Sequence, residues 1–416
     1  NDNEMSIAEN HGGLYQNLKE LRDTEGRSSC NFFRSLGLDY LYVGEGNDIP
    51  SLIAAFAKVK DTSRPTVVHI HTQKGKGYAP AEADREEFHW EMPFDLETGK
   101  PKVDCSGMED YHSLTGKFLL EKMKEDHTVV AISSGTPTVI GFTPERRKQA
   151  GRQFVDVGIA EEHAVALASG IAAGGGRPVY GVYSTFIQRC YDQLSQDLCI
   201  NGNPAVITVF MGTVAGMNDV THLGFFDIPL ISNIPNMVYL APTCSEEYFA
   251  MLEWAVRQTE YPVAIRVPGV AVVHRKEEFD TDYSELNRYK MTARGETVAI
   301  LALGSFYDLG QALKNKLREE SGVEATLINP RYITGLDEPM LEELKVGHRI
   351  VVTLEDGVLD GGFGEKIARY YGNSEMRVLN YGLRKEFADR YNLDELMKTN
   401  RLTDKQMAED IAGILE

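Results

Sequence analysis

The sequence predicts an α/β protein with three open, mostly parallel sheets wrapped by helices. Short β-branched runs alternate with longer amphipathic stretches along all 416 residues, which is typical of parallel strands joined by crossover helices. Two polar, charged stretches, 81–108 and 276–294, interrupt the alternation. We therefore divide the chain into domains 1–109, 110–290 and 291–416.

Nine apolar runs are strand candidates, because each is short, rich in β-branched residues and bounded by turn formers. They are 66–72, 128–133, 179–183, 205–210, 237–240, 263–266, 297–301, 325–328 and 349–354. A further run, 154–159, predicts a strand that ends near Ile159. Helical spacing of apolar residues over 246–258 and 308–319 predicts helices there, and the glycine run 174–176 predicts a helix end.

Composition and charge exclude several classes of protein. The chain is 42% hydrophobic and 25% charged, which is ordinary for a globular protein. Its 62 acidic residues outnumber the 43 Lys and Arg, and a formal net charge of −19 repels nucleic-acid phosphates. No apolar run reaches the roughly 18 to 20 residues that a membrane helix needs. The five cysteines are odd in number and widely spaced, which favours a reduced, cytoplasmic location without structural zinc: Cys30, Cys105, Cys190, Cys199 and Cys244.

One acidic residue follows a predicted strand directly. Glu161 comes just after the run 154–159 and opens a helix of small and apolar residues. Because ligands of open α/β sheets bind outside the carboxyl ends of the strands, Glu161 is a candidate site residue. The helix dipole alone also favours a carboxylate in a first helical turn, and for an isolated Glu this second explanation is the more common one.

Two further segments with polar and aromatic side chains follow predicted strands. Tyr183 and Phe186 come after one strand, where their rings either stack on a flat heterocycle or complete the core. Asn218, Asp219 and His222 lie in a glycine-containing loop after another strand, which fits a functional site or a surface hairpin.

Taken in order, these segments resemble the thiamine-diphosphate enzymes of the transketolase superfamily. The strings that carry the resemblance are 1–7, 74–82, 88–89, 94–95, 159–165, 183–193, 221–222 and, in the last domain, 355–362. As a collinear set they are highly specific. The resemblance implies a transketolase-like fold. In it, 1–109 is the C-terminal part of a diphosphate-binding domain plus a linker, 110–290 is the pyrimidine-binding domain, and 291–416 is a transketolase C-terminal-like domain.

Within the superfamily, the strings are most similar to the branch that makes 1-deoxy-D-xylulose 5-phosphate. This implies a transferase that condenses pyruvate, with loss of CO₂, and glyceraldehyde 3-phosphate, and so supplies isoprenoid, thiamine and pyridoxal precursors. It also implies thiamine diphosphate and Mg²⁺ as cofactors and a homodimer as the assembly. Two alternatives stay open: a transketolase-type ketol transfer with another donor or acceptor, and a catalytically degenerate partner subunit.

The resemblance also assigns roles in cofactor activation. A carboxyl group on the ring nitrogen of the aminopyrimidine promotes the tautomer that takes the thiazolium proton, and Glu161 matches that group. By resemblance, Phe186 stacks on the pyrimidine and Ile159 supports the bent cofactor. His89 and His222 match the imidazoles that relay protons near the reacting carbon.

The predicted metal site lies at the start of the chain. In the family, an Asp from a Gly-Asp-Gly motif binds Mg²⁺ together with an Asn side chain and a backbone carbonyl. The latter two groups match Asn3 and Met5, and the Gly-Asp-Gly motif would precede Asn1. Because the sequence also lacks an initiator Met and begins as though cut from a strand, we expect further native polypeptide upstream.

Substrate roles are carried over in the same way, to Tyr183, Arg266, Arg189 and Asn218. Tyr183 and Arg266 match groups at the phosphate end of the acceptor. Arg266 ends a buried strand, where either a bound phosphate or a carboxylate partner would resolve the cost of its charge. For Arg189 two roles are equally consistent with the sequence: a place at the edge of the site, or a structural salt bridge. Asn218 stands where the family has an Asp, a role that the adjacent Asp219 could take.

One departure from the family concerns phosphate binding. Met211 stands where the family has a phosphate-binding Arg. This predicts weaker phosphate binding, a replacement cation from elsewhere, or another acceptor aldehyde.

Overall fold

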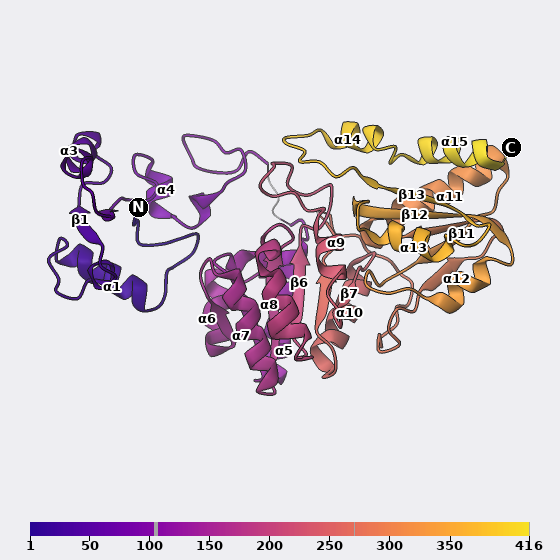
Figure 1. Cartoon of the computed structure of the whole chain (residues 1–416), viewed down its shortest axis with the longest axis horizontal. Helices are drawn as coiled ribbons and strands as arrows, with labels where there is room; N and C mark the ends of the chain where they lie inside the picture. Colours follow the sequence, from indigo (N-terminus) through magenta and orange to yellow (C-terminus); the bar gives the residue numbers. More distant parts are fainter. Residues whose placement is uncertain (104–106, 270, 416) are drawn as a thin grey trace. The chain divides into compact units, whose positions relative to one another are not determined.

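The computed structural model describes residues 1–103, 107–269 and 271–415. The chain forms two compact units: Asn1–Met108 with Val157–Ile159, and Glu109–Asp156 with Ala160–Glu416. The described residues form three sheets of two, six and five strands in the order of the sequence, with helices between the strands (Figure 1). In these parts of the chain all strand pairs except one are parallel, which confirms the predicted fold class. The division into three domains at the predicted boundaries stays a prediction.

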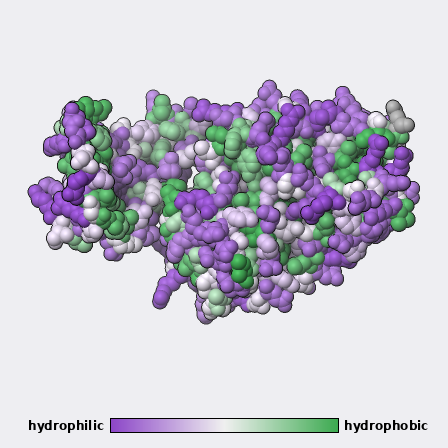
Figure 2. Space-filling model, viewed as in Figure 1, coloured by the Kyte–Doolittle hydropathy of each residue, from purple (hydrophilic) through white to green (hydrophobic). Residues whose placement is uncertain are grey.

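The first unit contains the two-stranded sheet. Its elements are α1 (Gly13–Asp23), α2 (Phe32–Ser35), β1 (Asp39–Val43), α3 (Ile49–Val59), β2 (Thr66–Ile70), α4 (Ala79–Ala83) and the short 3₁₀ helix η1 (Glu87–His89). Asp2 extends the sheet by a parallel bridge to His71. Ile49, Ile53 and Phe56 of α3 are exposed, and Figure 2 shows hydrophobic surface over this part of the chain.

The six-stranded sheet of the second unit is entirely parallel, in the order β4-β3-β5-β6-β8-β7. Its strands are β3 (Val129–Ser133), β4 (Phe154–Asp156), β5 (Arg177–Tyr183), β6 (Val206–Phe210), β7 (Val238–Leu240) and β8 (Val263–Arg266). β4 ends at Asp156, before the predicted end near Ile159, because Gly158 has a φ of 72° and leaves the extended conformation. In this order β4 lies on one side of β3 and β5 lies on the other. The chain thus proceeds in opposite directions from β3 and from β5, which creates a topological switch point between these two strands.

Helices and short helical turns connect these strands. They are α5 (Tyr111–Glu125), η2 (Pro137–Ile140), α6 (Pro144–Ala150), η3 (Gly151–Gln153), α7 (Glu161–Ala173), η4 (Phe186–Cys190), α8 (Tyr191–Gln193), η5 (Leu194–Cys199), α9 (Asp227–Ser232) and α10 (Ser245–Arg257). The side chain of Asp110 accepts a hydrogen bond from the Ser113 amide and so caps α5. As predicted, α7 ends at the glycine run, with Gly174 as its C-cap.

The five-stranded sheet follows in the order β13-β12-β10-β11-β9, with β9 antiparallel to β11. Its elements are β9 (Lys290–Ala293), β10 (Thr297–Ala302), η6 (Gly304–Phe306), α11 (Tyr307–Ser321), β11 (Thr326–Asn329), α12 (Glu338–Leu344), β12 (His348–Val358), α13 (Phe363–Tyr371), β13 (Arg377–Leu383), α14 (Leu393–Thr399) and α15 (Asp404–Leu415). Leu402, Met407 and Ile411 belong to the apolar core that the strands and α11 share.

Two expectations from composition concern membranes and cysteines. In the described part of the chain, no helix is both long enough and apolar enough to cross a bilayer. Cys30, Cys190, Cys199 and Cys244 are free thiols. Cys105 lies outside the described residues.

A glycine where α5 meets the loop after β3 gives a test of this packing. Gly141 has a φ of 78°, and a Cβ added there would lie 1.9 Å from the His112 carbonyl oxygen. Left-handed strain and overpacking together predict that Gly141→Ala lowers the free energy of unfolding by about 2 kcal/mol or more in urea titrations. The matched control is Gly170→Ala in α7, where no described atom apart from its chain neighbours and the helix's own backbone lies within 4 Å of the added Cβ. Gly170→Ala is expected to raise the free energy of unfolding by up to about 1 kcal/mol. Equal effects of the two changes would contradict the packing described.

Candidate active site

The carboxyl edge of the six-stranded sheet collects most of the predicted site residues of the second unit. Glu161 follows β4, Tyr183 ends β5, and the loop that carries His222 follows β6. Because all six strands are parallel, these chain positions lie at one edge of the sheet, beside the switch point.

Glu161 is buried at this edge, with 3% of its surface exposed. It is the first residue of α7, where the free backbone N–H groups and the helix dipole favour a negative charge. The Arg189 guanidinium bridges two carboxylates: Nη1 donates to Glu161 Oε2 at 2.9 Å and Nη2 donates to Glu162 Oε1 at 3.0 Å. The salt bridge considered for Arg189 is therefore present, and it draws one cation to the buried Glu161.

Aromatic rings lie in succession along the same edge. The ring centroids of Tyr183 and Phe186 are 5.5 Å apart, and those of Phe186 and His222 are 5.4 Å apart. Burial raises the pKa of the Tyr183 phenol, so this hydroxyl keeps its proton. The sequence leaves the roles of two segments open, the one with Tyr183 and Phe186 and the loop with His222. In the structure their rings meet at one place.

His112 joins this ring series, although no sequence motif pointed to it. Its imidazole stacks on Phe210 with centroids 4.7 Å apart and meets the edge of Tyr183. His112 Nδ1 lies 2.6 Å from the Val139 carbonyl oxygen, which assigns the proton to Nδ1. Burial lowers the pKa of His112 and so favours the neutral ring. Only the fold could reveal this residue, because α5 precedes β3 and its first turn reaches the carboxyl edge through tertiary packing.

Two buried hydroxyl groups at this edge have no hydrogen-bond partner among the described residues. Thr136 Oγ1 follows β3 and Ser184 Oγ follows β5, which are the two strands at the switch point. Their residues are 7% and 1% exposed. A buried polar atom without a partner is costly, so these hydroxyls mark a place that suits a polar ligand.

His222 is paired with a carboxylate of its own loop. His222 Nδ1 lies 3.0 Å from Asp219 Oδ1, and Thr221 also donates to this carboxylate. The hydrogen bonds from Thr221 and His222 lower the pKa of Asp219, so the carboxylate stays ionised. This arrangement places the imidazole proton on Nδ1 and leaves Nε2 as an acceptor. The structure thus places a carboxylate, that of Asp219, beside His222 and next to Asn218 in the chain.

Arg266 is a buried ion-pair partner at the end of β8. Its Nε donates to Asp227 Oδ2 at 2.7 Å, and Nη2 donates to the carbonyls of Gly224 at 3.2 Å and Asp356 at 2.6 Å. Burial disfavours the charge, but the carboxylates of Asp227 and Asp356 outweigh it and raise the pKa of Arg266. Of the two sequence-based alternatives for Arg266, the structure thus contains the carboxylate partner.

The other two positions singled out near the substrate have contacts of their own. Asn218 Nδ2 donates to the Tyr391 carbonyl at 3.0 Å. Met211 has a left-handed φ of 57° and packs against the core that Phe210 and Val267 share. Neither residue brings a cation to this edge.

His89, the second predicted imidazole, belongs to the first unit. It is exposed in η1. Partial loss of hydration and then the charge of Lys74 lower the pKa of His89, which favours its neutral form near pH 7.

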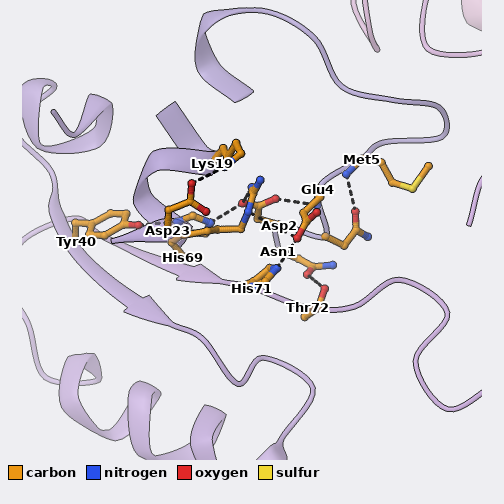
Figure 3. A network of polar contacts seen from close by, with 12 residues as sticks. Asn1, Asp2, Glu4, Met5, Lys19, Asp23, Tyr40, His69, His71 and Thr72 are labelled. Atoms are coloured by element: carbon orange, nitrogen blue, oxygen red, sulfur yellow. Dashed lines mark hydrogen bonds and ion pairs between the residues drawn. The ribbon is translucent and has the colours of Figure 1, made fainter. Parts of the chain in front are cut away.

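The predicted metal ligands also belong to the first unit and lie next to a polar network (Figure 3). Asn3 Oδ1 accepts a hydrogen bond from the Met5 amide at 3.3 Å. The preceding Asp2 is fixed by His69 Nε2 at 2.8 Å and by Arg22. Burial would raise the pKa of Asp2, but the hydrogen bonds from His69 and Arg22 hold it well below its ordinary value. The segment that offers the Asn3 and Met5 oxygens is therefore anchored to β2.

Comparison with known proteins shows the family to which the chain belongs. Residues 109–272 match the transketolase pyrimidine binding domain, and residues 288–407 match the transketolase C-terminal domain. The 1-deoxy-D-xylulose-5-phosphate synthase of Clostridium botulinum (strain Alaska E43 / Type E3) is 33% identical over 96% of this chain and 70% of its own length. That of Alkaliphilus oremlandii is 34% identical over 99% of this chain and 71% of its own length. The chain belongs to the 1-deoxy-D-xylulose-5-phosphate synthase family.

Solved structures agree with this family at the level of the fold. A split gene transketolase, described as an inactive beta4 tetramer, superposes with a TM-score of 0.62 at 21% identity, over 72% of this chain and 96% of that one. A transketolase of Pichia stipitis in complex with sedoheptulose 7-phosphate gives a TM-score of 0.60 at 15% identity, over 91% of this chain and 67% of that one. This 1-deoxy-D-xylulose-5-phosphate synthase family member therefore has a transketolase-like fold.

The ion pair of Arg266 makes a stability test possible. Asp227→Ala leaves a guanidinium of 5% exposure without its partner, so we expect a loss of about 3 to 5 kcal/mol in the free energy of unfolding. Asp360→Ala is the control, because Asp360 and Lys385 form an exposed pair whose loss should cost less than about 1 kcal/mol. Urea titrations of both variants measure the difference. A loss at Asp227 no larger than at Asp360 would show that the buried pair contributes little.

Proposed function

We propose that this chain condenses pyruvate, with loss of CO₂, and glyceraldehyde 3-phosphate to 1-deoxy-D-xylulose 5-phosphate, with thiamine diphosphate as cofactor. Membership of the 1-deoxy-D-xylulose-5-phosphate synthase family supports the reaction. The observation that carries the chemistry is the buried Glu161 carboxylate at the switch point of the parallel sheet.

The residues at this edge fit the pyrimidine of thiamine diphosphate. A flat heterocycle with ring nitrogens and an amino group needs an apolar face and a few polar partners. Phe186 and Tyr183 offer ring faces, Glu161 offers a buried carboxylate, and Thr136 and Ser184 offer hydroxyls that lack partners among the described residues. To Ile159, which is 53% exposed, we assign the support of the bent cofactor that the resemblance implies.

Glu161 and His222 have separate tasks in the proposed mechanism. When bound, thiamine diphosphate supplies a nucleophilic carbon and an electron sink. The Glu161 carboxylate would share a proton with a ring nitrogen of the pyrimidine, where burial strengthens the hydrogen bond. His222 accepts a proton at Nε2, and Asp219 stabilises the imidazolium that results. We assign to His89 a second proton transfer, for which its lowered pKa provides the neutral base.

We assign substrate binding to side chains at the carboxyl edge of the six-stranded sheet. The Tyr183 phenol keeps its proton and can donate it to a substrate oxygen. Arg189 is half-exposed, so its guanidinium can reach an anionic group from the rim. Asn218 retains a side-chain oxygen as an acceptor. The Arg266 guanidinium is bound to Asp227. Arg266 therefore acts on the acceptor substrate indirectly, through the loop that it holds.

Mg²⁺ and a homodimer are part of the same proposal. The Asn3 side-chain oxygen and the Met5 carbonyl are hard donors of the kind Mg²⁺ prefers, and they would hold the ion beside the cofactor diphosphate. Among the described residues, no group of three or more His, Cys, Asp or Glu forms another metal site. Sedimentation of the protein tests the dimer, and a monomer at catalytic concentrations would exclude it.

Substitution of Glu161 tests the proposed function most simply. Glu161→Gln keeps the side-chain volume but removes the exchangeable carboxyl group, so we expect CO₂ release from pyruvate in the presence of glyceraldehyde 3-phosphate to fall at least about 100-fold. Glu162→Gln is the matched control, because Glu162 binds the same Arg189 but is exposed, and its rate should change less than about threefold.

Two outcomes would contradict the proposal. Equal rates in the two variants would remove Glu161 from its role. A wild-type protein that turns over ketose phosphates but releases no CO₂ from pyruvate would favour the transketolase-type alternative.

A further inference from the structure

The loop that carries Asp219 and His222, residues 211–226, is held by the part of the chain that follows residue 288. Val214 is fixed on both sides: its N–H donates to Asp356 Oδ1 at 2.7 Å, and its carbonyl accepts the Tyr391 hydroxyl at 2.7 Å. Ser305 donates to the other oxygen of Asp356. The first half of the loop is therefore anchored to β12 and to the segment after β13.

The second half of the loop is bound by three consecutive residues of that segment. Arg390 N–H donates to the Asn218 carbonyl at 2.6 Å, and the Tyr391 carbonyl accepts the Asn218 amide at 3.0 Å. Val220 N–H donates to Asp389 Oδ1 at 3.1 Å. These contacts flank Asp219 on both sides, and Val220 is two residues from His222. Residues 389–391, which we call the loop clamp, thus contact the loop on both sides of Asp219.

The backbone of the loop clamp is strained at the point of contact. Arg390 has a φ of 47°, in the left-handed region that favours glycine. Such a conformation is unfavourable in a residue with a side chain, and it persists where the surrounding contacts over-determine it. The short Arg390–Asn218 bond is such a contact. Aromatic packing reinforces it, because Phe225 lies against Tyr391 and Phe226 lies against Phe387.

We propose that the loop clamp is a positioning element of the active site, in which Asp389 and Tyr391 act through the Asp219–His222 pair. The inference rests on the proposed function of His222. An imidazole on a loop is not fixed by the sheet itself, and a displacement of about 1 Å can reduce a rate 100-fold. Five hydrogen bonds from the clamp and Asp356 to Val214, Asn218 and Val220 prevent this displacement.

The first experiment measures the loop directly. Tyr391→Phe removes one hydroxyl and keeps the ring against Phe225. The matched control is Tyr371→Phe, which removes a hydroxyl bonded to the Leu341 carbonyl at 2.7 Å, away from the loop. Amide hydrogen exchange over 211–226 should be roughly fivefold faster in Tyr391→Phe, and unchanged in Tyr371→Phe. Equal exchange in both variants would overturn the proposal.

The second experiment separates positioning from a general loss of structure. Asp389→Ala removes the acceptor of Val220 N–H, whereas Asp389→Asn keeps an oxygen there. We expect kcat to fall about tenfold in Asp389→Ala, with KM for pyruvate within about twofold of wild type, and Asp389→Asn to recover most of the rate. A loss that Asp389→Asn does not recover, or a change in KM alone, would contradict a positioning role.

The two proposals fail in different ways. A wild-type chain that releases no CO₂ from pyruvate ends the proposed function. The exchange rates over 211–226 still decide whether the clamp fixes the loop, because they need no turnover.

Discussion

The buried guanidinium of Arg266 connects the parts of the second unit on which the site depends. It ends β8, binds Asp227 at the start of α9, and donates to Gly224 in the loop 211–226 and to Asp356 in β12. A charge of this burial is stable only with its partners in place, so the ion pair couples the edge of one sheet to the neighbouring sheet. The same Asp356 holds Val214, and the position of His222 therefore depends on groups from both sheets.

Most of the fold could be predicted from the sequence because parallel strands are buried on both faces. All nine predicted runs form strands, from β2 to β12. β1, β9 and β13 were missed, since polar residues interrupt their apolar pattern, among them the half-exposed Tyr40, Lys290 and Asn380. The end of β4 was placed too late because Gly158, rather than the apolar pattern, terminates the strand.

The place of a candidate site residue was predictable where a motif ties it to a strand end, and not where only tertiary packing brings it to the edge. Glu161, Phe186 and His222 follow β4, β5 and β6 in the chain, and the structure gathers them at one edge. The role of Asp219 depended on a hydrogen bond that the loop makes only when folded. His112, Thr136 and Ser184 carry no local pattern, and the carboxylate that neutralises Arg266 comes from a helix 39 positions away.

The central claim is that the Glu161 carboxylate receives the aminopyrimidine of thiamine diphosphate at the switch point between β3 and β5. A crystal structure of the protein with bound thiamine diphosphate and Mg²⁺ tests it most directly. The account predicts a pyrimidine nitrogen within hydrogen-bonding distance of Glu161 and the ring against Phe186. A pyrimidine bound elsewhere, with Glu161 still held by Arg189 alone, would contradict it.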